Sequence, residues 1–83
     1  MLTRNLIRAA RALLGWEQRD VSRAAGLAEG TIQRMERVGP ERSRAENVNK
    51  VQKALENGGI VFIRENGGGP GVRLRDAPPD DET

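Results

Sequence analysis

The stretch from Gln18 to Arg37 constrains the fold more than any other part of this chain, because a glycine separates two short apolar repeats. Val21 and Ala25 lie four residues apart and therefore share one face of a helix. Gly26 follows directly, where helices commonly end in a left-handed residue that glycine adopts at little cost. Leu27 comes next and can be buried at the junction between the two helices. The segment therefore predicts two short helices joined by a tight turn.

The second of these helices is predicted over residues 29–37 and has two distinct faces. Ile32 and Met35, three residues apart, form the apolar face. The opposite face carries Glu29, Gly30, Gln33, Arg34 and Arg37. Two such helices around a tight turn form the helix-turn-helix pattern, whose second helix enters the major groove of DNA.

The chain resembles the DNA-binding domains of the lambda-repressor/Cro-like helix-turn-helix family over residues 4–57. The residues that carry the resemblance are Leu14-Gly15-Trp16-x-Gln18, Val21, Ala25-Gly26-Leu27, Thr31-Ile32 and Glu36, with Arg11 upstream. The resemblance implies a mainly α fold, with a four-helix DNA-binding domain in residues 1–57 and helices at about 4–14, 18–25, 29–37 and 44–57.

Apolar spacing predicts the first and fourth helices independently of the resemblance. The first has Thr3 as its N-cap and an inward stripe of Ile7, Ala10 and Leu14. For the fourth, Ser43 and Glu46 form a capping box, in which each side chain bonds the other's backbone. Its inward stripe consists of Val48, Val51 and Leu55.

Residues 60–75 predict a β-hairpin, with strands at 60–63 and 72–75 around a glycine-rich loop. An isolated two-stranded hairpin is marginal in water, so this one must pack on the helices or pair with another chain. We expect it to contribute to a homodimer interface through Phe62 and Leu74. The competing explanation is that both residues belong to the domain's own core. Residues 76–83, with two prolines and four acids, are expected to be disordered.

The net charge of +2 conceals an asymmetry along the chain. All 14 Lys and Arg lie in residues 1–75 with eight acids, which gives +6, and the last eight residues carry −4. Twelve of the 14 cations are Arg, whose forked guanidinium suits phosphate and guanine. This composition alone fits a solvated surface equally well. Together with the helix-turn-helix pattern it favours DNA.

The composition also excludes several classes of protein. The absence of Cys and His rules out disulfides and the usual zinc, haem and thiol chemistry, and it is compatible with a reducing cytoplasm. The chain lacks an apolar run of about 18 residues, and Arg interrupts the apolar residues at the N-terminus, so neither a membrane span nor a secretory signal is predicted. We expect a cytoplasmic bacterial protein without metal, cofactor or enzymatic activity, since no catalytic pair of side chains converges on an evident pocket.

Position and chemistry assign roles to individual side chains in DNA recognition. The resemblance places Glu29 and Gly30 at positions that reach base edges, and chemistry adds Gln33 and Arg34. Gln suits adenine, Arg suits guanine and Glu accepts from cytosine. For Glu29, compensation of the helix dipole is an equal alternative. For Gly30, one alternative is that glycine lets the backbone approach the groove closely. The other is that this glycine is a neutral sequence change without a role in recognition. The resemblance implies phosphate contacts from Gln18 and Arg11, and we also expect them from Thr31, Arg37, Arg42 and Arg44.

The resemblance implies a pair between Arg11 and Glu36 that fixes the first helix against the third. Trp16 is expected to pack at the base of the second helix against the C-terminal segment. Glu17 and Ala28 depart from the family, because they stand where Ser or Thr usually caps the second and third helices. We expect the weaker cap at Ala28 to cost about 1 kcal/mol.

The sequence therefore predicts a transcription regulator that binds double-stranded DNA, as a homodimer on a roughly palindromic operator. Both repression by blocking RNA polymerase and activation by touching it remain open. The alternative is a protein-interaction module of the same fold, such as an antitoxin or an anti-regulator. The weakened caps and Gly30 favour this alternative, whereas Gln18, Arg34 and Arg37 favour DNA.

Overall fold

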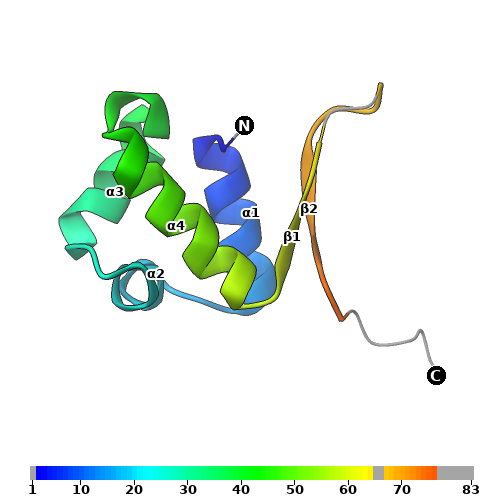
Figure 1. The fold of residues 1–83 in the computed structure, drawn as a ribbon, viewed down its shortest axis with the longest axis horizontal. Helices are drawn as coiled ribbons and strands as arrows, with labels where there is room; N and C mark the ends of the chain where they lie inside the picture. The colour runs from blue at the N-terminus through cyan, green and yellow to red at the C-terminus, as the bar shows by residue number, and fades with distance from the viewer. Residues whose placement is uncertain (1, 65–66, 77–83) are drawn as a thin grey trace.

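The computed structural model describes residues 2–64 and 67–76, and in these the protein is mainly α with a small antiparallel hairpin (Figure 1). The elements are α1 (Arg4–Leu14), α2 (Gln18–Ala25), α3 (Glu29–Val38), the 3₁₀ turn η1 (Pro40–Arg42), α4 (Ala45–Asn57), β1 (Ile60–Ile63) and β2 (Gly71–Leu74). The mainly α class with a C-terminal hairpin is the one that the sequence predicts.

The first two helices begin and end where their capping residues predict. The Thr3 hydroxyl accepts a hydrogen bond from the Leu6 N–H at 3.1 Å, which satisfies one free donor of the first turn of α1. Gly15 and Gly26 follow α1 and α2 with φ of 69° and 70°, the left-handed conformation that ends a helix. Both glycines therefore direct the chain into the next element without strain.

The connection between α3 and α4 differs from the prediction. The third helix is predicted to end at residue 37, yet α3 extends to Val38, and Pro40–Arg42 form η1. The Ser43 N–H donates to the Pro40 carbonyl at 2.9 Å and closes this turn. Arg44 is consequently the N-cap of α4, with no side-chain cap bond. The predicted capping box of Ser43 and Glu46 is wrong, because Ser43 already ends the preceding turn.

The core lies where the four helices and β1 meet. Its largest fully buried side chains are Ile7, Val21, Ile32, Met35, Val51, Leu55 and Ile60. Trp16 packs against this cluster from the junction of α1 and α2. A methyl group added at Gly58 would come within 2.7 Å of the Trp16 ring, so the indole lies directly against the end of α4. The expected packing of Trp16 against the C-terminal segment is confirmed.

The hairpin packs on the protein's own helices through one face. Its strands pair Ile60 with Leu74 and Phe62 with Val72, and these four side chains all contact the helical core. Figure 1 shows the hairpin beside α1 and far from α3. The packing of Phe62 and Leu74 supports the competing explanation that they belong to the domain's own core.

The bounds of the second strand need a correction. β2 runs over Gly71–Leu74 rather than residues 72–75, although the Arg75 N–H still donates to the Gly59 carbonyl at 2.7 Å. The predicted disorder of residues 76–83 stays a prediction, because all of these residues except Asp76 lie outside the described residues.

Candidate nucleic-acid interface

The structure gathers the predicted base-reading residues on one open face of α3. Ile32, Met35 and Glu36 are the buried residues of this helix. The exposed residues are Glu29, Gly30, Gln33, Arg34 and Arg37. The helix thus presents a polar face to solvent while its apolar face holds it on the core.

Of the predicted phosphate contacts, Thr31 and Arg37 lie on α3 itself, and Gln18, Arg42 and Arg44 lie on elements next to it in the chain. Gln18 is the first residue of α2, which packs directly against α3, and Gln18 and Thr31 are both partly exposed. Arg42 and Arg44 are exposed in η1 and at the N-cap of α4, just beyond the end of α3. Cationic or polar side chains therefore precede and follow the base-reading face, as backbone contacts to DNA require.

The N-terminal end of α3 has little support from side chains. Ala28 is the N-cap, with φ of −67° and ψ of 146°, and it makes no side-chain cap bond. A Cβ built at Gly30 would meet nothing within 4 Å. Glu29 is the acidic residue of the first turn, where its charge suits the positive end of the helix dipole.

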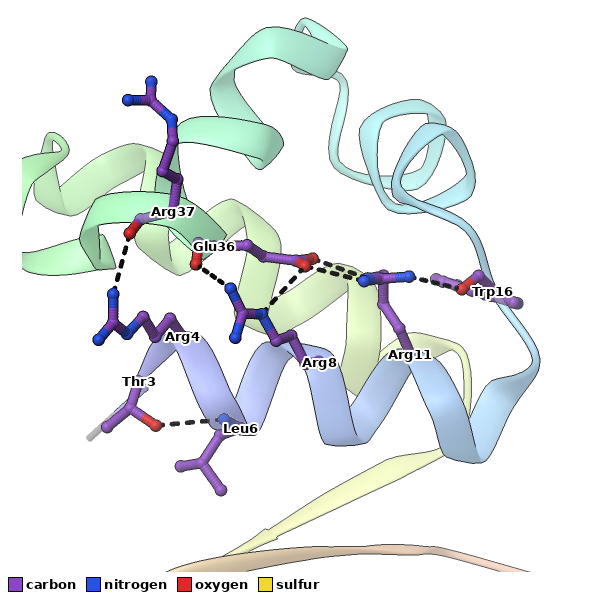
Figure 2. A network of polar contacts seen from close by, with 8 residues as sticks. All are labelled: Thr3, Arg4, Leu6, Arg8, Arg11, Trp16, Glu36 and Arg37. Atoms are coloured by element: carbon purple, nitrogen blue, oxygen red, sulfur yellow. Dashed lines mark hydrogen bonds and ion pairs between the residues drawn. The ribbon is translucent and has the colours of Figure 1, made fainter.

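The C-terminal end of α3 is held by a buried ion pair (Figure 2). Glu36 is only 4% exposed, and Arg11 forks onto its carboxylate with Nε–Oε2 and Nη2–Oε1 distances of 2.7 and 2.8 Å. This hydrogen bonding raises the pKa of Arg11 above its ordinary value. The pair that the resemblance implies is present, and it joins α1 to α3.

The same geometry changes the interpretation of Arg11 as a phosphate contact. Its third nitrogen, Nη1, donates to the Trp16 carbonyl at 3.2 Å. All three nitrogens of the guanidinium therefore already donate within the protein. Arg11 is placed to hold α1, α3 and the α1–α2 junction together, and the remaining phosphate candidates are better placed to contact DNA.

Two further arginines of α1 contact the end of α3, and the sequence analysis did not identify either. Arg8 Nη2 donates to the Glu36 main-chain carbonyl at 2.7 Å, and Arg8 Nε lies 3.7 Å from Glu36 Oε1. Arg4 Nη1 donates to the main-chain carbonyl of Arg37 at 2.9 Å. The last carbonyls of a helix lack partners within it, and cations suit its negative end, so both contacts are favourable.

The spacing of these arginines in the sequence predicts that they share one face of α1. Arg4, Arg8 and Arg11 occupy positions i, i+4 and i+7 of α1, which places them in one row. Their partners lie 25 to 33 residues away in the chain, and spacing within one helix cannot identify them. Figure 2 also shows the Arg37 side chain pointing away from this row.

The start of α2 has its own local polar contacts. The Glu17 N–H donates to the Asp20 carboxylate at 2.8 Å, so Asp20 satisfies a backbone donor at the N-cap. The Glu17 side chain pairs with Arg19, with 2.8 Å between Oε1 and Nε, and this bond raises the pKa of Arg19. Both of these side chains are largely exposed. Glu17 thus makes a surface pair in addition to its role as a cap.

Searches of the described residues add two structural findings. In residues 2–64 and 67–76, none of the helices is long and apolar enough to cross a membrane. In the same part of the chain, His, Cys, Asp and Glu form no group of three that would hold a metal ion. Comparison with known proteins gave no matching family model and no matching curated protein.

Proposed function

We propose that this protein is a transcription regulator that binds specific sequences of double-stranded DNA, and that its helices have the lambda-repressor-like arrangement. The observation that supports this proposal most is the division of α3 into two faces. Ile32 and Met35 are fully buried, whereas Gln33 and Arg34 are exposed. A short helix whose apolar face packs on the core and whose polar face is exposed matches a recognition helix.

The chemistry of this face suits the major groove. An α helix with its side chains is about 10–12 Å across, and the groove is about 12 Å wide. Gln33 can bond adenine in a bidentate manner, and Arg34 can do the same with guanine. The neighbouring side chains Gln18, Thr31, Arg37, Arg42 and Arg44 would fix the register by contacting phosphates.

The proposal includes a homodimer, because one short helix reads few base pairs and a second copy repeats the contact one helical turn away. Phe62 and Leu74 contact the protein's own core, which leaves them less surface for a partner. Of the hairpin's apolar side chains, Ile63 is the one classed as exposed, at 38%. If the hairpin joins the copies, Ile63 is better placed than Phe62 or Leu74 to do so.

A second candidate is a protein-interaction module such as an antitoxin or an anti-regulator. The observation that favours it is the weak N-terminal end of α3. Ala28 makes no side-chain cap bond there, and Gly30 follows two residues later. On this alternative the open face of α3 would contact a protein and DNA binding would be absent.

The experiment that separates the two begins with selection of genomic fragments by the purified protein. Fluorescence anisotropy then measures affinity for the enriched duplex and for a scrambled one over a range of salt. A regulator shows a linear fall of log K with log salt, in proportion to the number of phosphates contacted. Absence of binding at low salt contradicts the regulator and favours the interaction module.

Arg34→Ala sharpens the test at a single side chain. We expect it to relax preference at one base pair by about 1–3 kcal/mol, because one forked contact to a base is lost. Arg73→Ala is the matched control, since it removes the same charge from an exposed position on β2. Equal weakening on every sequence would show that Arg34 contacts phosphate instead.

A further inference from the structure

We propose that Arg4 and Arg8 are positioning residues that set the rotation of α3 about its own axis. Together with Arg11 they form a row on α1, here called the arginine clamp, that contacts the C-terminal end of α3. This inference rests on the proposed function, since the rotation of α3 decides which of its side chains face the DNA bases.

The clamp holds both the side chain and the main chain of α3. Arg11 bonds the Glu36 carboxylate, and rotation about the bonds of the Glu36 side chain can keep this contact while the helix turns. Arg8 and Arg4 bond the carbonyl oxygens of Glu36 and Arg37, which are rigid parts of the helix. Successive residues of an α helix lie about 100° apart, so a rotation by one residue would take both carbonyls away from their donors. The main-chain contacts therefore restrain rotation more tightly than the ion pair does.

The rest of α3 fixes its rotation only coarsely. The buried side chains of Ile32 and Met35 decide which face of the helix meets the core, whereas apolar contacts are not directional and restrain smaller rotations less. Ala28 and Gly30 add no side-chain hydrogen bond at the N-terminal end. The clamp is thus the set of contacts best suited to fix the angle at which Gln33 and Arg34 project.

Arg4 and Arg8 are separable from the stability of the fold. The Arg8 side chain is 51% exposed, although its bond to the Glu36 carbonyl is partly buried, and the Arg4 contact is exposed. Exposed polar contacts contribute little to stability. Their donors point at α3 rather than outward (Figure 2). Loss of either side chain should therefore leave the protein folded while α3 gains rotational freedom.

The test compares the wild type with R4Q, R8Q and the double variant, using R73Q as the matched control. The readouts are affinity for the enriched duplex, affinity for a scrambled duplex, and the salt dependence of both. We expect the ratio of specific to non-specific affinity to fall about tenfold in the double variant. This is the size of effect that one mismatched base pair in a binding site causes. The salt slope should stay unchanged, because the number of phosphate contacts is unchanged.

Three results would overturn the clamp. A merely structural role lowers the melting temperature and weakens both duplexes by the same factor, so the ratio stays constant. A role as phosphate contacts lowers the salt slope by about one for each arginine removed. Unchanged behaviour in R4Q, R8Q and the double variant would equally contradict the proposal.

Amide hydrogen exchange adds a readout that needs no DNA. We expect residues 35–39 to exchange several-fold faster in the double variant, with α2 and α4 unchanged, because opening is local. If the wild type binds no DNA, the proposed function and the clamp's role in specificity both fail, and exchange still decides whether the clamp orders α3. If the wild type binds specifically and the affinity ratio does not move, the clamp alone fails.

Discussion

The two ends of α3 are built in opposite ways. At the C-terminal end, Glu36 is buried under a forked bond from Arg11, and two more arginines bond the last carbonyls. At the N-terminal end, Ala28 offers no cap bond and Gly30 stands in open space. The two ends of one helix therefore differ in how firmly they are held. On the proposed function, the C-terminal end would orient the helix and the N-terminal end would leave side chains free for a partner.

The largest expected effect comes from breaking the held end with Glu36→Gln. This change keeps the shape of the side chain but leaves Arg11 without its counter-charge. Loss of one partner of a buried pair costs about 3–5 kcal/mol. Because the Arg11 side chain keeps 23% exposure, we expect roughly 2–3 kcal/mol here, somewhat below the range for buried pairs. Thermal unfolding measures it, at about 4–8 °C per kcal/mol for a domain of this size.

The Glu17–Arg19 pair is the control for Glu36→Gln. It has nearly the same bond length, 2.8 Å against 2.7 Å, but both of its side chains are largely exposed. Glu17→Gln should leave the melting temperature almost unchanged, because exposed pairs contribute little to stability. Similar melting temperatures for the two variants would show that burial does not distinguish these pairs.

The sequence predicts the helices of this protein well because their signals are local. Gly15 and Gly26 end α1 and α2 in the left-handed conformation, and the spacing of Ile32 and Met35 identifies the buried face of α3. These features depend on residues within a few positions of one another. The same reasoning finds the exposed face of α3, which holds the candidate site.

Contacts between distant elements are where sequence reasoning fails or needs outside help. Arg11 and Glu36 were paired only through the family resemblance, and the contacts of Arg4 and Arg8 were missed. Ser43 matched a capping box locally, but η1 used that residue to close its own turn. In each case the deciding partner is set by how elements pack, which no short pattern encodes.

A pair of glycine substitutions sharpens the comparison from the open end. Gly26 and Gly30 would both place a new methyl group in open space, but only Gly26 has a positive φ, of 70°. Gly26→Ala should cost about 1–2 kcal/mol, because an L-residue is strained in that conformation. Gly30→Ala should stabilise by up to about 1 kcal/mol through helix propensity. Urea unfolding of both variants measures the opposite signs.

Gly30→Ala also separates the two interpretations of Gly30 in DNA recognition. If the backbone approaches the groove closely, the new methyl group lowers affinity for the enriched duplex while stability rises. If Gly30 is a neutral sequence change without a role in recognition, affinity for the enriched duplex stays the same or improves. A loss of stability in Gly30→Ala would contradict the expectation that space and backbone geometry both permit a side chain there.

The smallest expected effect comes from supplying the missing cap with Ala28→Ser. The backbone of Ala28 already has the extended geometry of an N-cap, so a serine hydroxyl would be positioned to accept from an amide of the first turn. We expect a gain of about 0.5–1 kcal/mol in urea unfolding, which would make the two ends of α3 more alike. Ala24→Ser, at an exposed interior position of α2, is the control and should cost up to about 0.5 kcal/mol. Equal changes in the two variants would mean that the hydroxyl acts through general helix propensity, and that the start of α3 is not limited by its cap.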